Sequence, residues 1–159
     1  VKTEGGYLLN PLSADTIYKY SHEGICEPYI ARTPGLASMD DPVYLQAGVE
    51  TSDYIFLNTV RIDADSEEDM FPGHALVYDK KQRKPYRCKV VNADYPEQEI
   101  ELDAHVVDHV DRPRCGVIRL HADALLTALE VGKLHGTLKS LAQSLHAEDN
   151  DVLMLLKFR

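Results

Sequence analysis

The sequence contains no tryptophan and only three phenylalanines. Nine tyrosines therefore supply most of the aromatic surface, and because each hydroxyl needs a partner or water, we expect many of these rings at the margin of the core. Cysteine is scarce too: Cys26, Cys88 and Cys115 are widely spaced, odd in number and form no Cys-x-x-Cys pair. We therefore expect free thiols in a reducing, cytoplasmic or other intracellular compartment rather than a disulfide framework.

Long apolar runs are absent as well. The longest one, Val152 to Leu156, is far too short to cross a bilayer, so no membrane partner is expected. The chain begins at Val1 rather than at Met, and its first residues lack the pattern of a signal peptide. A start at Val1 fits removal of an initiator methionine, proteolytic processing or excision from a longer chain equally well.

Positive charge is in the minority. The 17 basic residues stand against 26 acidic ones, which leaves a formal net charge of −9. A chain with this charge repels a phosphate backbone, so no nucleic-acid partner is expected. There is also no glycine-rich phosphate loop, no Gly-x-Ser-x-Gly element, no dinucleotide fingerprint and no internal repeat.

The composition of what remains is that of an ordinary globular protein. The 159 residues, 44% of them hydrophobic, predict a single domain that buries about two-thirds of its unfolded surface. Proline and glycine interrupt every apolar run in residues 1–41, which predicts a loop-rich arm with brief strands. The candidate strands of the arm are Tyr7–Leu9, Thr16–Tyr20 and Pro28–Ala31.

Residues 42–159 are predicted to form a β-rich body. Stretches rich in β-branched and aromatic residues predict strands at 42–49, 54–62 and 115–120, and a hairpin with arms at 74–78 and 86–91. Residues 100–110 alternate between apolar and polar, which predicts a strand with one face in solvent.

A change of period marks the C-terminal part of the body. Leucines recur at spacings of three and four from Leu125 to Leu145, which predicts an amphipathic helix over about residues 122–146. Two helices that meet near Gly132 are an equal alternative. Residues 152–158 then predict a returning strand buried on both faces. The expected fold class is α+β, a mostly antiparallel β-sheet or small barrel with one C-terminal helix or helix pair.

One polar face has the composition of a metal site. The predicted strand at 100–110 places acids and histidines on one side, and imidazole with carboxylate is a common ligand set for zinc, iron or manganese. The candidate metal ligands are Asp103, His105, His109 and Asp111, beside Glu101. On a strand, His105 and His109 are about 13 Å apart, too far to bind one ion together. A solvated face is therefore the competing interpretation.

Other motifs are weaker. Cys26 lies four residues from His22, but no third residue that would orient a thiol–imidazole pair can be identified. The acidic segment at 63–69 lacks the glycine and the final glutamate of a calcium-binding hand. His135 and Thr137 form a His-x-Thr element, but it lacks a mate and falls within the helical pattern.

A basic run occupies the tip of the predicted hairpin and is the candidate interaction surface. Its members are Lys80, Lys81, Arg83, Lys84 and Arg87. On an acidic chain they can contact an acidic partner, or they can simply solubilise the tip and protect it from edge pairing. We expect a non-enzymatic assembly or interaction protein that self-associates or binds a protein partner, as in shell- or virion-like assemblies. The alternative is a small metal-dependent enzyme or ligand-binding barrel that uses the Asp103/His105/His109/Asp111 face.

Overall fold

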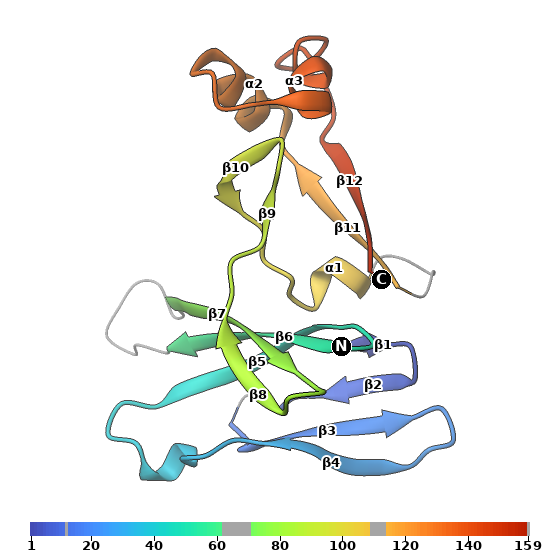
Figure 1. Ribbon diagram of the computed structural model, residues 1–159, viewed down its shortest axis with the longest axis vertical. Helices are drawn as coiled ribbons and strands as arrows, with labels where there is room; N and C mark the ends of the chain where they lie inside the picture. Colours follow the sequence, from blue (N-terminus) through green and yellow to red (C-terminus); the bar gives the residue numbers. More distant parts are fainter. Residues whose placement is uncertain (12, 62–70, 109–113, 159) are drawn as a thin grey trace.

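The computed structural model describes residues 1–11, 13–61, 71–108 and 114–158. The fold is α+β, as predicted, and its strands form four separate antiparallel sheets rather than a closed barrel. Two of the sheets, formed by residues before position 90, lie in the lower part of Figure 1, and the rest of the chain forms the upper part. None of the described helices is long and apolar enough to cross a membrane.

The first 41 residues form a four-stranded sheet and are more regular than the predicted arm. Its strands, in spatial order, are β1 (Lys2–Thr3), β2 (Gly6–Leu9), β3 (Thr16–Ser21) and β4 (Cys26–Ala31), followed by the short 3₁₀ helix η1 (Leu36–Ser38). The three brief strands predicted here are confirmed. Pro28 is tolerated because β4 is an edge strand, where a missing N–H breaks no ladder.

The second sheet confirms the next group of predicted strands, except that the hairpin arm predicted at 86–91 ends at Arg87. It contains β5 (Val43–Glu50), β6 (Tyr54–Arg61), β7 (Phe71–Asp79) and β8 (Lys84–Arg87), in that order. The β7–β8 hairpin turns over residues 80–83, where Arg83 has a positive φ of 56°. Leu8 and Ile17 of the first sheet pack with Ile55 and Leu57 of the second in one buried cluster.

The upper part combines two hairpin-like strand pairs with the helix pair. Its elements are β9 (Val91–Asn92), β10 (Tyr95–Glu99), α1 (His105–Asp108), β11 (Cys115–Leu120), α2 (Ala122–Glu130), α3 (Gly136–Ala142) and β12 (Val152–Lys157). The chain leaves α2 at Gly132, whose φ of +72° favours glycine, so the two-helix alternative is the correct one. Leu125, Leu134 and Leu138 form the centre of a core shared by both helices.

The strand predicted at 100–110 is wrong. Residues 100–104 form no strand, and α1 begins at His105, whose N–H donates to Asp103 Oδ1 at 2.9 Å. The apolar members of the alternating pattern are buried for a different reason: Leu102 and Val106 pack with Val49 of β5. The alternation of apolar and polar residues here spans an extended segment and one helical turn, and in the sequence it has the same pattern as a strand.

Gly48 lies where the lower and upper parts meet. The Val49 N–H donates to the Leu102 carbonyl at 3.0 Å. A Cβ atom added at Gly48 would clash with that same carbonyl oxygen. Only glycine allows the backbone of β5 to approach residues 102–103 so closely.

The C-terminal strand is confirmed, but its predicted burial on both faces is wrong. Val152, Met154 and Leu156 pack against the two upper cores, whereas Leu153 is 65% exposed and Leu155 is 50% exposed. In the described ranges, the cores pack against the even-numbered side of β12 and leave the odd-numbered side exposed.

Candidate protein-interaction site

The β11–β12 sheet presents an apolar outer face. β11 and β12 are antiparallel, with Val117 opposite Leu155 and Arg119 opposite Leu153. Because side chains alternate across a strand, these four residues lie on the same side, away from the cores that bury Ile118 and Met154. Leu153 and Leu155 are exposed neighbours on this face, and the exposed charged residues Arg119 and Lys157 lie beside them.

The outer edge of β12 has no strand beside it in the described part of the chain. Among the described strands, β12 pairs with β11 alone (Figure 1). The Phe158 N–H donates to the Arg114 carbonyl at 2.8 Å, so the even-numbered residues of β12 direct their backbone groups to β11. Leu153, Leu155 and Lys157 consequently direct their N–H and C=O groups outward, toward the open edge.

This edge carries few of the features that protect edge strands from pairing. Proteins commonly protect an edge with proline, a bulge, an inward-pointing charge or a very short strand. β12 has six residues, an unbroken register with β11 and one charged residue, Lys157, at its end. Its centre, Leu153 to Leu156, is entirely apolar. Such a strand is suited to accept another strand.

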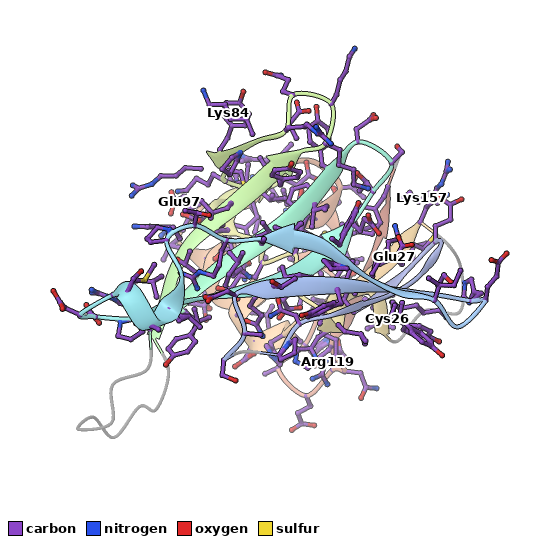
Figure 2. The ribbon with its side chains drawn as sticks, turned by 90° about the horizontal axis from the view of Figure 1, so that it is seen from below. Cys26, Glu27, Lys84, Glu97, Arg119 and Lys157 are labelled. Atoms are coloured by element: carbon purple, nitrogen blue, oxygen red, sulfur yellow. The ribbon has the colours of Figure 1, made fainter. Side chains whose placement is uncertain are left out.

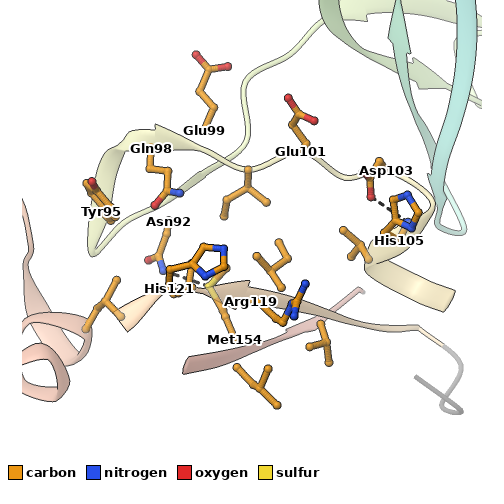
Figure 3. Close-up of a pocket in the computed structure, with 17 residues that line it drawn as sticks. Asn92, Tyr95, Gln98, Glu99, Glu101, Asp103, His105, Arg119, His121 and Met154 are labelled. Atoms are coloured by element: carbon orange, nitrogen blue, oxygen red, sulfur yellow. Dashed lines mark hydrogen bonds between the residues drawn. The ribbon is translucent and has the colours of Figure 1, made fainter. Parts of the chain in front are cut away.

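A pocket of about 780 Å³ opens beside β11, on the other edge of the same sheet. Residues from β9 and β10, from the segment that follows β10 and from β11 line it, together with Leu153 and Met154 of β12. Figure 3 shows Glu99 and Glu101 pointing away from Arg119 and His121. The pocket therefore holds the basic group of Arg119 together with the neutral and acidic groups of the other lining residues, Asp103 among them.

Only two of the four predicted metal ligands, Asp103 and His105, lie in the described residues. Asp103 and His105 both line the pocket, but the Asp103 carboxylate accepts the backbone N–H of His105 and so begins α1. His109 and Asp111, like the acidic segment 63–69, lie outside the described residues. Within the described ranges, no group of three or more His, Cys, Asp or Glu side chains is placed to bind an ion.

The basic residues of the β7–β8 hairpin divide into two kinds. Lys80 turns inward, and its ammonium group lies 2.8 Å from the buried carboxylate of Glu50. Lys81, Arg83, Lys84 and Arg87 are exposed. Figure 2 shows Lys84 projecting from the ribbon, and its ammonium group lies 5.6 Å from the centre of the Tyr86 ring. Lys80 therefore serves the fold, and the other four remain available to a partner.

Glu50 is the centre of a buried charge cluster that sequence patterns did not reveal. Its carboxylate accepts hydrogen bonds from Tyr29 (2.7 Å) and from Lys19 (3.3 Å) as well as from Lys80. Burial alone would raise the pKa of Glu50, but the hydrogen bonds from Lys80 and Tyr29 and the charges of Lys80 and Lys19 outweigh it and lower the pKa. Burial, followed by the hydrogen bond to Glu50, raises the pKa of Tyr29.

The thiol–imidazole pair gains no support from the geometry. Cys26 lies in β4, opposite Tyr20, with its side chain exposed. The His22 ring instead packs edge-on against Tyr7, with ring centroids 6.3 Å apart. Burial raises the pKa of the Cys88 thiol, which disfavours its thiolate.

Comparison with protein-family models, with curated proteins and with solved structures found no match for this chain. The outer edge and face of β12, together with the pocket beside β11, were missed at the sequence level. A run of five apolar residues carries no alternation that could distinguish the exposed side of β12 from the buried one.

Proposed function

We propose that this protein is a non-enzymatic interaction protein, a subunit of a larger homo- or hetero-oligomeric assembly, that joins its partner by strand addition to the β11–β12 sheet. The observation that carries the proposal is the open edge of β12, with Leu153 and Leu155 exposed beside it. In strand addition, backbone hydrogen bonds supply affinity and alternate side chains supply specificity. β12 offers both, because the same residues direct their backbone groups outward and expose apolar side chains.

The exposed basic side chains of the hairpin supply a second contact in this proposal. Lys81, Arg83, Lys84 and Arg87 form a positive surface on a chain with a net charge of −9. A partner with an acidic surface, including another subunit of the same kind, complements it. Exposed charges at the edge of an interface act mainly on the rate and the specificity of association.

A proline at position 155 tests strand addition directly. The Leu155 N–H points away from β11, so Leu155→Pro removes a donor of the open edge and leaves the ladder to β11 in place. Leu155→Val is the matched control, because it keeps the N–H, the apolar character and the strand propensity. Circular dichroism and the melting temperature report whether each variant is folded.

The probe is a library of random extended peptides displayed on phage and selected on the immobilised wild-type protein. We expect selected peptides, measured afterwards by fluorescence anisotropy, to bind the wild type and Leu155→Val. They should bind Leu155→Pro at least tenfold more weakly. Hydrogen exchange should slow at residues 153–157 when peptide is bound. If no selected peptide distinguishes Leu155→Pro from Leu155→Val, strand addition at this edge is wrong.

A further inference from the structure

The residues at the two ends of β12 have opposite charges and lie on the same face. Asp151 immediately precedes the strand and Lys157 ends it. Leu153, Leu155 and Lys157 occupy alternate positions of β12 and so share the outer face. Asp151 continues this alternation one residue before the strand, and its Oδ1 lies 3.0 Å from Nδ1 of His121, the residue that follows β11. Along this face the order is acid, leucine, leucine, base.

This order is complementary to itself when the strand is reversed. If two copies of β12 pair antiparallel about a two-fold axis at Met154, Leu153 lies opposite the partner's Leu155. Asp151 then lies opposite the partner's Lys157, and the two-fold axis repeats each pair. In this register each leucine lies opposite a leucine, and each charge lies opposite a charge of the other sign. Both are favourable cross-strand combinations.

The backbone of β12 permits the same register. An antiparallel pair needs opposed residues that both direct their N–H and C=O groups toward the shared edge. Leu153, Leu155 and Lys157 do so, because the even-numbered residues are bonded to β11. Met154 falls at the axis as a non-hydrogen-bonded pair, which the alternation of an antiparallel ladder allows.

The neighbouring registers that the backbone also permits are worse. With the axis at Leu153, Asp151 lies opposite the partner's Leu155, and with the axis at Leu155, Lys157 lies opposite the partner's Leu153. Both place a charge against a leucine. The register centred on Met154 pairs both charges and both leucines.

We propose that the strand added at the open edge of β12 is β12 of a second copy, in the register centred on Met154; this inference rests on the proposed function. The product is a continuous sheet with the order β11–β12–β12–β11. The pocket lies beside β11, away from the partner strand, and reaches the seam only through Leu153 and Met154. An isologous contact of this kind closes on itself and gives a defined dimer.

Charge reversal tests both the partner and the register. Asp151→Lys places two positive charges opposite each other at both ends of the pair, and Lys157→Asp places two negative charges there. We expect each single variant to dimerise roughly tenfold more weakly than the wild type. The double variant Asp151→Lys/Lys157→Asp restores opposite charges and should regain the wild-type dissociation constant. Analytical ultracentrifugation measures all four proteins.

Mixing the two single variants gives a sharper result. Asp151→Lys pairs with Lys157→Asp at both ends, so native mass spectrometry of the mixture should show the heterodimer in excess over both homodimers. His121→Gln is the control for the first variant, because the His121 Nδ1 lies 3.0 Å from Asp151 Oδ1 within the same chain. It alters that contact without changing the pairing across the axis, and its dimerisation should equal that of the wild type.

The outcomes separate this inference from the proposed function. A wild-type protein that stays monomeric up to millimolar concentration overturns the inference. A dimer whose dissociation constant is unchanged by the charge reversals also overturns it, as does a mixture of the two single variants without excess heterodimer. The proposed function fails separately, when no random peptide depends on the N–H at position 155. A monomer whose peptide binding is lost in Leu155→Pro upholds strand addition and assigns the edge to another protein.

Discussion

The ammonium group of Lys80 lies 2.8 Å from the carboxylate of Glu50, whose side chain is only 5% exposed. Lys80 comes from the β7–β8 turn and Glu50 from the end of β5, and Lys19 and Tyr29 reach the same carboxylate from the first sheet. One buried acid therefore connects both sheets of the lower part. The other buried contacts between these two sheets are apolar, whereas the hydrogen bonds to Glu50 depend on direction and so fix how the sheets are oriented.

Replacing Glu50 by glutamine should destabilise the fold strongly. Glu50→Gln keeps the size of the side chain but leaves Lys19 and Lys80 without their negative partner. Removing one partner of a buried pair costs on the order of 3 kcal/mol in the free energy of unfolding. Urea denaturation measures this, with the exposed Glu27→Gln as the control. Equal stability of the two variants would contradict a structural role for the cluster.

The contribution of Glu50 should disappear in acid. Because the folded-state pKa lies below the ordinary value of 4.5, folding favours the charged form of this carboxyl. Its contribution is therefore complete above pH 4.5 and is lost as the pH falls through the lower folded-state pKa. The difference in unfolding free energy between wild type and Glu50→Gln should be constant from about pH 5 to 8 and should shrink below that range. A difference that grows in acid would contradict this assignment.

Two adjacent lysines should respond differently to the same substitution. Lys80→Met removes a hydrogen-bonded partner of Glu50 and should lower the unfolding free energy by about 2 kcal/mol. Lys81→Met alters an exposed side chain and should leave stability unchanged. Thermal unfolding of the two variants is the measurement. If Lys81→Met is the less stable variant, Lys80 is not the lysine that stabilises the fold.

Asp94 should stabilise the start of α3. Its carboxylate Oδ2 accepts the N–H of Leu138 at 3.1 Å, and its backbone carbonyl accepts the N–H of His135 at 2.8 Å. Asp94→Ala removes the first of these bonds and should cost about 1 kcal/mol, the usual effect of losing a helix cap. Chemical denaturation measures the loss. Asp149→Ala, which removes a carboxylate that accepts the N–H of His146 in an exposed turn, is the control and should cost less.

The thiols should react in the order of their exposure. Cys26 is exposed, whereas Cys88 is half-buried and its pKa is raised by burial, so its thiolate is scarcer. A disulfide reagent at pH 8 should therefore modify Cys26 first. Cys26→Ser should remove the fast phase, and Cys88→Ser should leave it intact. A fast phase that disappears only in Cys88→Ser would reverse the order.

The strands that could be predicted from sequence are those with a local signal. Tyr54–Arg61 and Cys115–Leu120 are rich in β-branched or aromatic residues, and the helix pair follows leucine spacing interrupted at Gly132. The failures occurred where a contact distant in sequence decides the conformation. Residues 100–104 alternate like a strand, but Leu102 and Val106 are held by Val49, and the Asp103 carboxylate starts a helical turn instead.

The sequence by itself determined the α+β class, the helix pair and most of the strands, because propensity and periodicity act between near neighbours. It also determined the self-complementary order of charge and leucine from Asp151 to Lys157, on which the proposed dimer depends. Only the tertiary structure decided that Lys80 turns inward to Glu50 and that Leu153 and Leu155 face outward. Both depend on which distant segments cover a surface, and the burial of a side chain is a property of all its neighbours in space.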